Sequence, residues 1–263
     1  MPSKVEHAVD TGGTYPVVRL TGVLDADTAA AVRFAIVGVL ASQPEAVVID
    51  VFDLELPDPA AASVLRDLAR ETADWPGAHL VLCARSAGSW HTGGLPVWRS
   101  RAEAFGELGD PEPPRQLRLD LEPVMGAARR SRELVTEACG RWDRPELVGA
   151  ACIVVTEMVN NVVAHARTPM TVLLGLRGDA MAVAVRDHSD TAPQFRGPVS
   201  PTSYGGRGLL LIDSVADRWG SLALAAGKVV WALLQLQDDR PAAQAAHVNG
   251  AACRTGPVGR LRT

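Results

Sequence analysis

The feature that most limits how this chain can fold is the segment Gly109–Pro114, which reads GDPEPP. Its prolines fix φ and remove backbone donors, so neither a helix interior nor a central strand can run through it. The segment therefore divides the 263-residue chain into two parts, enough for two domains of roughly 100–200 residues each. We predict a first domain at 14–109, a linker at 110–115, a second domain at 116–237 and a flexible tail at 238–263.

The composition is that of folded globular domains. Hydrophobic residues make up 47% of the chain and charged residues 21%. The net charge of −4 gives no electrostatic reason for nucleic acid to be a direct partner. The cysteines are far apart in the sequence, which indicates reduced thiols, and the first ten residues lack the pattern of a signal peptide. Because no run approaches about 18 consecutive apolar residues, we expect a soluble cytoplasmic protein without a membrane partner.

The first half alternates strand and helix patterns. Strands are predicted at Tyr15–Leu20, Ala46–Val51 and Ala78–Ala84, the last two from continuous apolar runs that contain β-branched residues. Helices are predicted over 28–40 and 60–73. Residues 1–13 are polar and are predicted to be a loose start. Strands that alternate with helices predict an α/β domain.

In this order the first half, over about 14–109, resembles a STAS domain, the fold of anti-anti-sigma factors. The resemblance rests on GVLD at 22–25, VVID at 47–50 and DPAAASVL at 58–65. In that family the last segment usually begins Asp-Ser-Ser-Gly, and its second serine accepts a phosphate from a partner kinase. This chain has Ala60 there, and without a hydroxyl that position cannot be phosphorylated. Ser63 is the alternative acceptor, but a STAS fold kept for docking is the interpretation that we favour.

In the second half, the stretch Cys152–Ala166 is the most informative. Its apolar residues predict a helix with one buried face, and Glu157, Asn161 and His165 follow one another at intervals of four. A carboxylate, an amide and an imidazole aligned beside a buried face indicate the wall of a site. The alternative is a helix with a solvated polar stripe.

Three further features follow this helix. A predicted hairpin over 170–186 leads to Asp187. The loop 188–205 contains three prolines and no periodicity, and unstructured loops of that length are commonly functional, often as lids. It ends in Gly-Gly-Arg-Gly at 205–208, directly before an apolar helical pattern, and small residues at a helix start let backbone amides approach an anion.

This order of motifs resembles the GHKL ATPase domain over about 116–237, and most closely its anti-sigma-factor serine kinase branch. ADRWG at 216–220 and GKVVW at 227–231 add to the resemblance. It implies an α/β sandwich, with a mixed sheet and helices on one face, that binds ATP and Mg²⁺.

The resemblance also implies roles for individual residues. Asn161 would hold Mg²⁺, Glu157 would be the general base toward the attacking hydroxyl, and Asp187 would accept a hydrogen bond from the adenine amino group. For His165 we favour a structural role over a role in the site. The predicted cofactor-binding set comprises Asn161, Asp187, Gly206, Arg207, Gly208 and Lys228.

Two residues depart from the family pattern. Ser189 stands where a glycine would let the backbone approach the base, and Val229 stands where a hydroxyl residue is often found near the adenine. Each lost polar contact would cost on the order of 1 kcal/mol. We therefore expect nucleotide binding that is weakened but not abolished.

Two hypotheses follow. The first is a serine/threonine kinase that uses Mg-ATP to phosphorylate a separate STAS-type antagonist and that sequesters a sigma factor. The second is a non-catalytic scaffold whose STAS half occupies or mimics the antagonist surface, as the missing serine at position 60 suggests. A sensor histidine kinase would need a dimerisation helix pair bearing a phosphoacceptor His before Glu157, and we see none. Homodimers are common in the resembling kinase branch, so a homodimer is among the expected assemblies.

Overall fold

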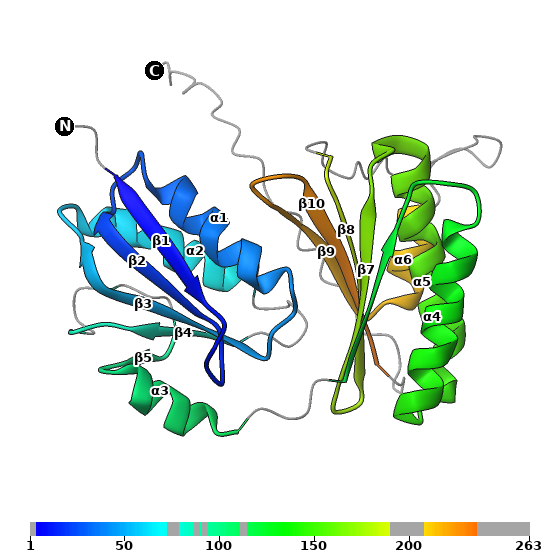
Figure 1. The fold of residues 1–263 in the computed structure, drawn as a ribbon, viewed down its shortest axis with the longest axis horizontal. Helices are drawn as coiled ribbons and strands as arrows, with labels where there is room; N and C mark the ends of the chain where they lie inside the picture. The colour runs from blue at the N-terminus through cyan, green and yellow to red at the C-terminus, as the bar shows by residue number, and fades with distance from the viewer. Residues whose placement is uncertain are drawn as a thin grey trace, which may run out of the picture.

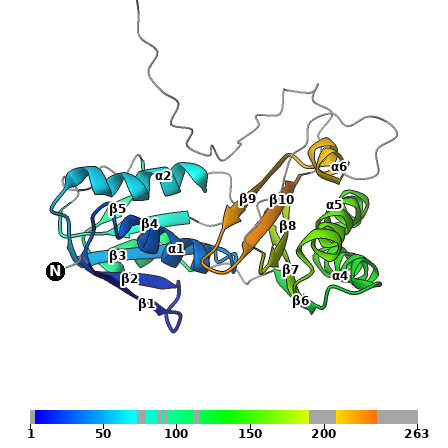
Figure 2. The ribbon, with the colours of Figure 1, turned by 90° about the horizontal axis from the view of Figure 1, so that it is seen from above.

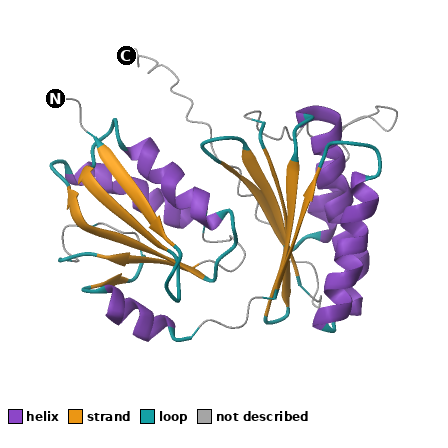
Figure 3. Ribbon diagram, viewed as in Figure 1, coloured by secondary structure: helices purple, strands orange, loops and turns teal. Residues whose placement is uncertain are grey.

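The structure, a computed structural model, describes residues 4–72, 79–86, 90, 94–110, 115–189 and 208–235. Within these ranges each half of the chain forms its own five-stranded sheet with helices packed on it (Figure 1; Figure 3). Sheet A belongs to the first half and sheet B to the second.

Sheet A confirms the α/β prediction for the first half. Its strands have the order β1-β2-β3-β4-β5. Their bounds are Val5–Asp10, Val17–Val23, Ala46–Glu55, His79–Cys83 and Val97–Trp98. Only β1 is antiparallel to its neighbour, so the sheet is mixed. Helices α1 (Ala29–Leu40) and α2 (Ser63–Glu71) cover one face, and α3 (Arg101–Leu108) covers the other (Figure 1).

Strand β1 lies in the segment that we predicted to be a loose start. Five of its six residues are exposed, so it has no buried face that would produce an alternating sequence pattern. Its hydrogen bonds to β2 hold it at the sheet edge instead. This strand lies before residue 14, where we placed the start of the first domain.

The segment that resembles the phosphoacceptor region begins with a capped turn. Asp58 accepts a hydrogen bond from Ala60 N at 2.9 Å, at the start of a short 3₁₀ turn, Pro59–Ala62. Helix α2 follows directly from Ser63. The predicted helix over 60–73 is therefore a 3₁₀ turn and an α-helix in succession.

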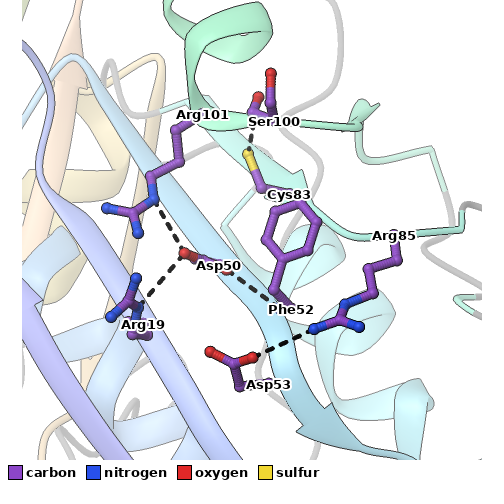
Figure 4. Close-up of polar contacts among 8 residues, drawn as sticks. All are labelled: Arg19, Asp50, Phe52, Asp53, Cys83, Arg85, Ser100 and Arg101. Carbon is purple, nitrogen blue, oxygen red and sulfur yellow. Dashed lines mark hydrogen bonds and ion pairs between the residues drawn. The ribbon is translucent and has the colours of Figure 1, made fainter.

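A buried carboxylate joins α3 to the centre of sheet A (Figure 4). Asp50, on β3, is 2% exposed. Its Oδ2 lies 3.0 Å from Arg101 Nε and 3.7 Å from Arg19 Nε, and its Oδ1 accepts a hydrogen bond from Phe52 N at 3.1 Å. A buried charge is tolerated when it is paired and hydrogen-bonded, which explains an aspartate at the end of the apolar run VVID.

Cys83, on β4 beside this cluster, predicts a pH dependence of stability. Burial, and then the negative charge of Asp50, raise the pKa of its thiol from 9.0 to about 11. The folded state therefore holds this proton more tightly than the unfolded chain. The resulting stabilisation is fully present below pH 9 and is lost as pH rises toward 11.

We expect the free energy of unfolding of the wild type, relative to Cys83→Ala, to fall by about 2 kcal/mol between pH 8 and 11. Urea unfolding of both proteins across this range measures it. Comparison with the variant removes the contributions of other groups that titrate there. A difference that stays constant with pH would show that the thiol is not buried as described.

Sheet B corrects one prediction for the second half. Its order is β6-β7-β8-β10-β9. The strands span Gln116–Leu121, Met170–Arg177, Ala180–Asp187, Arg218–Ala223 and Lys228–Leu234 in chain order. All neighbouring strands are antiparallel, so the predicted mixed sheet is wrong. Between β6 and β7, a connection that contains two helices reverses the direction of the chain. Strands β8 and β9 run parallel to each other, and β10 lies between them, antiparallel to both.

Helices α4 (Ala127–Trp142), α5 (Val148–Asn161) and α6 (Gly208–Val215) lie on one face of sheet B, as predicted (Figure 2). Turns at both ends extend α5 to a run over Pro145–Ala166 that by length and composition would suffice to cross a membrane. This run packs against α4, α6, β8 and β10. A core helix passes the same test, and the packing accounts for the apolar composition of α5.

The other face of sheet B packs against the first half of the chain. The buried cluster of α1 and sheet A also contains side chains of β8, β9 and β10 and of the residue that follows β9; they are Ala184, Leu222, Val229, Trp231 and Leu224. At the edge of this contact, Arg177 donates a hydrogen bond to Glu45 O at 3.2 Å, and Gln116 donates one to Gln43 O. The two halves therefore share one hydrophobic core.

Candidate functional site

The predicted polar stripe places Glu157 and Asn161 one turn apart on α5, and both side chains are partly exposed. His165 does not continue this stripe within the α-helix. It lies in the π-helical turn Val162–Ala166 and is exposed. A π-helical turn holds more residues than an α-helical turn, so a spacing of four no longer keeps side chains in line there.

The start of α6 lies directly against the two stripe residues. A Cβ built on Gly208 would lie 2.7 Å from Glu157 Oε2 and 3.6 Å from both polar side-chain atoms of Asn161. With any larger residue at position 208 the Glu157 carboxylate would have to shift, so this close contact is most easily made with glycine. Gly206 and Arg207, the other predicted phosphate-binding residues, lie outside the described residues.

Asp187 ends β8 and is buried, with 1% of its surface exposed. Its side chain points toward the helices, because it continues the alternation of Val183 and Val185, which pack in the cluster beneath them. Lys228 is its direct cross-strand partner on β10. Lys228 Nζ lies 3.0 Å from Oδ1 and 2.9 Å from Oδ2, so the two predicted residues form a buried ion pair.

The turn between β9 and β10 fixes this pair. Gly227 has φ +99°, and a Cβ there would lie 2.0 Å from Asp187 O and 2.6 Å from His188 Cα. No side chain fits in that space, so the turn can press against the end of β8 only with glycine. The sequence predicted a tight turn here but not its contact with Asp187.

The structure corrects the assignment of Val229. Neighbouring residues of a strand point to opposite faces, and Val229 packs in the core shared with the first half. Lys228 and Val230 point to the helix face instead. Val229 therefore lies on the wrong side of sheet B to contact a ligand beside Asp187, and its lack of a hydroxyl is not a loss to that site. Ser189, the other departure, donates its backbone N–H to Asp187 Oδ1 at 2.8 Å.

A cavity of about 830 Å³ lies elsewhere, between β6 and the start of α4. Four of the charged side chains that line it form two ion pairs, Arg118 with Asp120 at 3.0 Å and Arg129 with Glu133 at 2.9 Å. A hydrogen bond from Thr171 and then the neighbouring Arg118 lower the pKa of Asp120. Glu157, Asn161 and Asp187 do not line this cavity. We therefore place the candidate site where α5 meets the start of α6, beside the ends of β8 and β10.

Family models match a stretch within each half of the chain. Residues 119–233 match the family described as histidine kinase-like ATPase domain, and residues 7–82 match the family described as Mlab, STAS domain. The first range contains the α5 stripe, Asp187 and Gly208, and the second contains the three segments on which the STAS resemblance rests. No curated protein matches the chain.

Two solved structures are similar to part of the chain. An anti-sigma factor antagonist from Mycobacterium paratuberculosis is 24% identical, with a TM-score of 0.34, over 41% of this chain and 96% of that one. The anti-sigma factor antagonist SpoIIAA in its unphosphorylated form is 18% identical, with a TM-score of 0.31, over 39% of this chain and 96% of that one.

Proposed function

We propose that this chain, which joins a STAS domain to a histidine kinase-like ATPase domain, is a partner-switching regulator that acts as a protein serine/threonine kinase. Its second domain would bind Mg-ATP and transfer a phosphoryl group to a separate STAS-type antagonist. The observation that carries the proposal is the meeting of Glu157 and Asn161 with Gly208 at the start of α6.

The residues at this meeting point fit a magnesium nucleotide. Carboxylate and amide oxygens suit Mg²⁺, which commonly takes one or two protein ligands and completes its shell with water and phosphate oxygens. No group of three or more His, Cys, Asp or Glu that could hold a metal occurs among the described residues. We propose Asn161 as the protein ligand because the family resemblance implies that role for it. The bare Cα of Gly208 lets the backbone at the helix start approach an anion closely. The magnesium nucleotide would supply the transferable group with its charge partly neutralised.

The remaining chemistry belongs to the side chains. Glu157 would accept the proton of the attacking hydroxyl, and its position against Gly208 places the base beside the proposed phosphate site. Asn161 would orient the nucleotide through its amide, one turn further along α5. Asp187 would accept a hydrogen bond from the nucleobase. Gly206 and Arg207 remain proposed phosphate contacts.

The placement of the STAS domain supports a separate protein as substrate. It packs on the face of sheet B opposite α5 and α6 (Figure 2). Ala60 follows the carboxyl end of β3, whereas the contacts of Gln43 and Glu45 with sheet B lie before its amino end. The ten residues of β3 separate these ends by roughly 33 Å. The segment of this chain that corresponds to the phosphoacceptor region, residues 58–65, therefore begins at the end of β3 that is far from the second domain.

A non-catalytic scaffold is the second candidate function. It is favoured by Ala60, which cannot accept phosphate, and by the ion pair that already occupies Asp187. Under either function we propose a sigma factor or a STAS-type antagonist as the partner and the bacterial cytoplasm as the setting. A homodimer would have to use a surface other than the face of sheet B that the STAS domain covers.

Titration of Mg-ATP into the full chain tests the proposal. We expect saturable binding that Asn161→Ala weakens at least about tenfold, because the variant loses the proposed metal ligand. Asn160→Ala is the matched control: Asn160 is the preceding residue of the same helix and is exposed. Equal weakening by both substitutions, or no binding by the wild type, would refute the nucleotide site and leave the scaffold.

A further inference from the structure

The ion pair between Asp187 and Lys228 occupies the carboxylate that the proposed function assigns to the nucleobase. Lys228 Nζ donates a hydrogen bond to Oδ1 at 3.0 Å, lies 2.9 Å from Oδ2 and donates to Ser189 O at 3.4 Å. A lysine ammonium has three N–H donors, one for each of these three contacts. The side chains of Lys228 and Asp187 are only 13% and 1% exposed, so water competes little for the pair.

The pair is built into the strand register. Lys228 faces Asp187 directly across β10 and β8. The glycine turn before Lys228 presses on the backbone of Asp187 and His188, which limits how far the start of β10 can shift. Ser189 N adds a further hydrogen bond to Oδ1. The carboxylate is therefore nearly saturated with donors before any ligand arrives.

This saturation changes what a nucleobase can gain at Asp187. An unpaired buried carboxylate favours a purine with an amino group at position 6, which donates a hydrogen bond. It disfavours one with an oxygen there, since two acceptors would face each other. With Lys228 in place, the amino group must compete with the donors of Lys228 and Ser189 N for this carboxylate. An oxygen at position 6 is instead attracted by the positive charge of the ammonium beside the carboxylate.

We propose that Lys228 is a specificity-determining residue that cancels the preference of the site for 6-aminopurine over 6-oxopurine nucleotides. This inference rests on the proposed function, in which Asp187 faces the nucleobase. The site then accepts the magnesium complexes of both nucleotide classes with similar affinity.

The test compares Mg-ATP with Mg-ITP, which carries an oxygen in place of the 6-amino group. Both are titrated into the full wild-type chain and into Lys228→Met. We expect wild-type dissociation constants within about threefold of each other. Lys228→Met should favour ATP by about tenfold or more, because methionine fills similar space without a donor and leaves Asp187 to the amino group. Lys228→Arg keeps the cation and should match the wild type.

Each outcome decides the matter. A wild type that prefers ATP by tenfold or more overturns the inference but leaves the proposed nucleotide site intact. An unchanged ratio in Lys228→Met also overturns the inference alone. Binding of neither nucleotide by the wild type refutes the proposed function, and the inference falls with it. The wild-type ratio needs no variant, so the proposal can be refuted even if Lys228→Met does not fold.

Discussion

Replacing Glu157 with glutamine is expected to slow phosphoryl transfer to a STAS-type substrate by about 100- to 10,000-fold, the usual range for a lost general base. Glutamine keeps the size and hydrogen-bonding reach of the side chain, so its contact with Gly208 and the packing of α5 on α6 should survive. Mg-ATP binding should change little, because the proposed metal ligand is Asn161. Single-turnover transfer from labelled ATP measures the rate, and calorimetry measures the binding.

The matched control is Glu137→Gln on α4. Glu137 is exposed and pairs with Arg141 on the same helix, so its neutralisation should leave transfer unchanged. A wild-type rate in Glu157→Gln would remove Glu157 from the chemistry. A protein that binds Mg-ATP but transfers no phosphate to any STAS-type substrate would support the scaffold.

Replacing Trp231 with alanine is expected to lower the free energy of unfolding by about 3–5 kcal/mol, the usual cost of truncating a buried aromatic side chain. Trp231 is 4% exposed and lies in the core that both halves share. It packs over Gly220, its cross-strand partner, where an added Cβ would approach the indole ring to 3.0 Å. The cavity left by alanine would open at the contact between the domains.

Urea unfolding followed by far-UV circular dichroism measures this effect. Because the shared core couples the halves, we expect one cooperative transition in the wild type. Trp219→Ala is the control: Trp219 is on β9, partly exposed, and points to the helix side, so its loss should cost less. Two separate wild-type transitions, or equal costs for the two tryptophans, would show that the domains do not share a core in solution.

Local sequence patterns determined which elements form. The proline-rich break, the apolar strands of the first half and the amphipathic helix around Glu157 and Asn161 each depend on neighbouring residues, whose periodicity sets the element and its buried face. The order of motifs in the second half identified the ATPase family before any contact was known. The residue types of Gly208 and Asp187, and their places in the order of motifs, were enough to predict both as site residues.

Only the tertiary structure decided how these elements meet. Strand pairing and register depend on contacts between residues distant in sequence, so the antiparallel order of sheet B was not predicted. Register also turned Lys228 toward Asp187 and Val229 toward the STAS domain, because adjacent side chains of a strand point to opposite faces. The sequence did not predict the shared core around Trp231, because that core also depends on contacts between residues distant in sequence. An apolar sequence predicts that a strand is buried, but it does not predict which domain covers the strand.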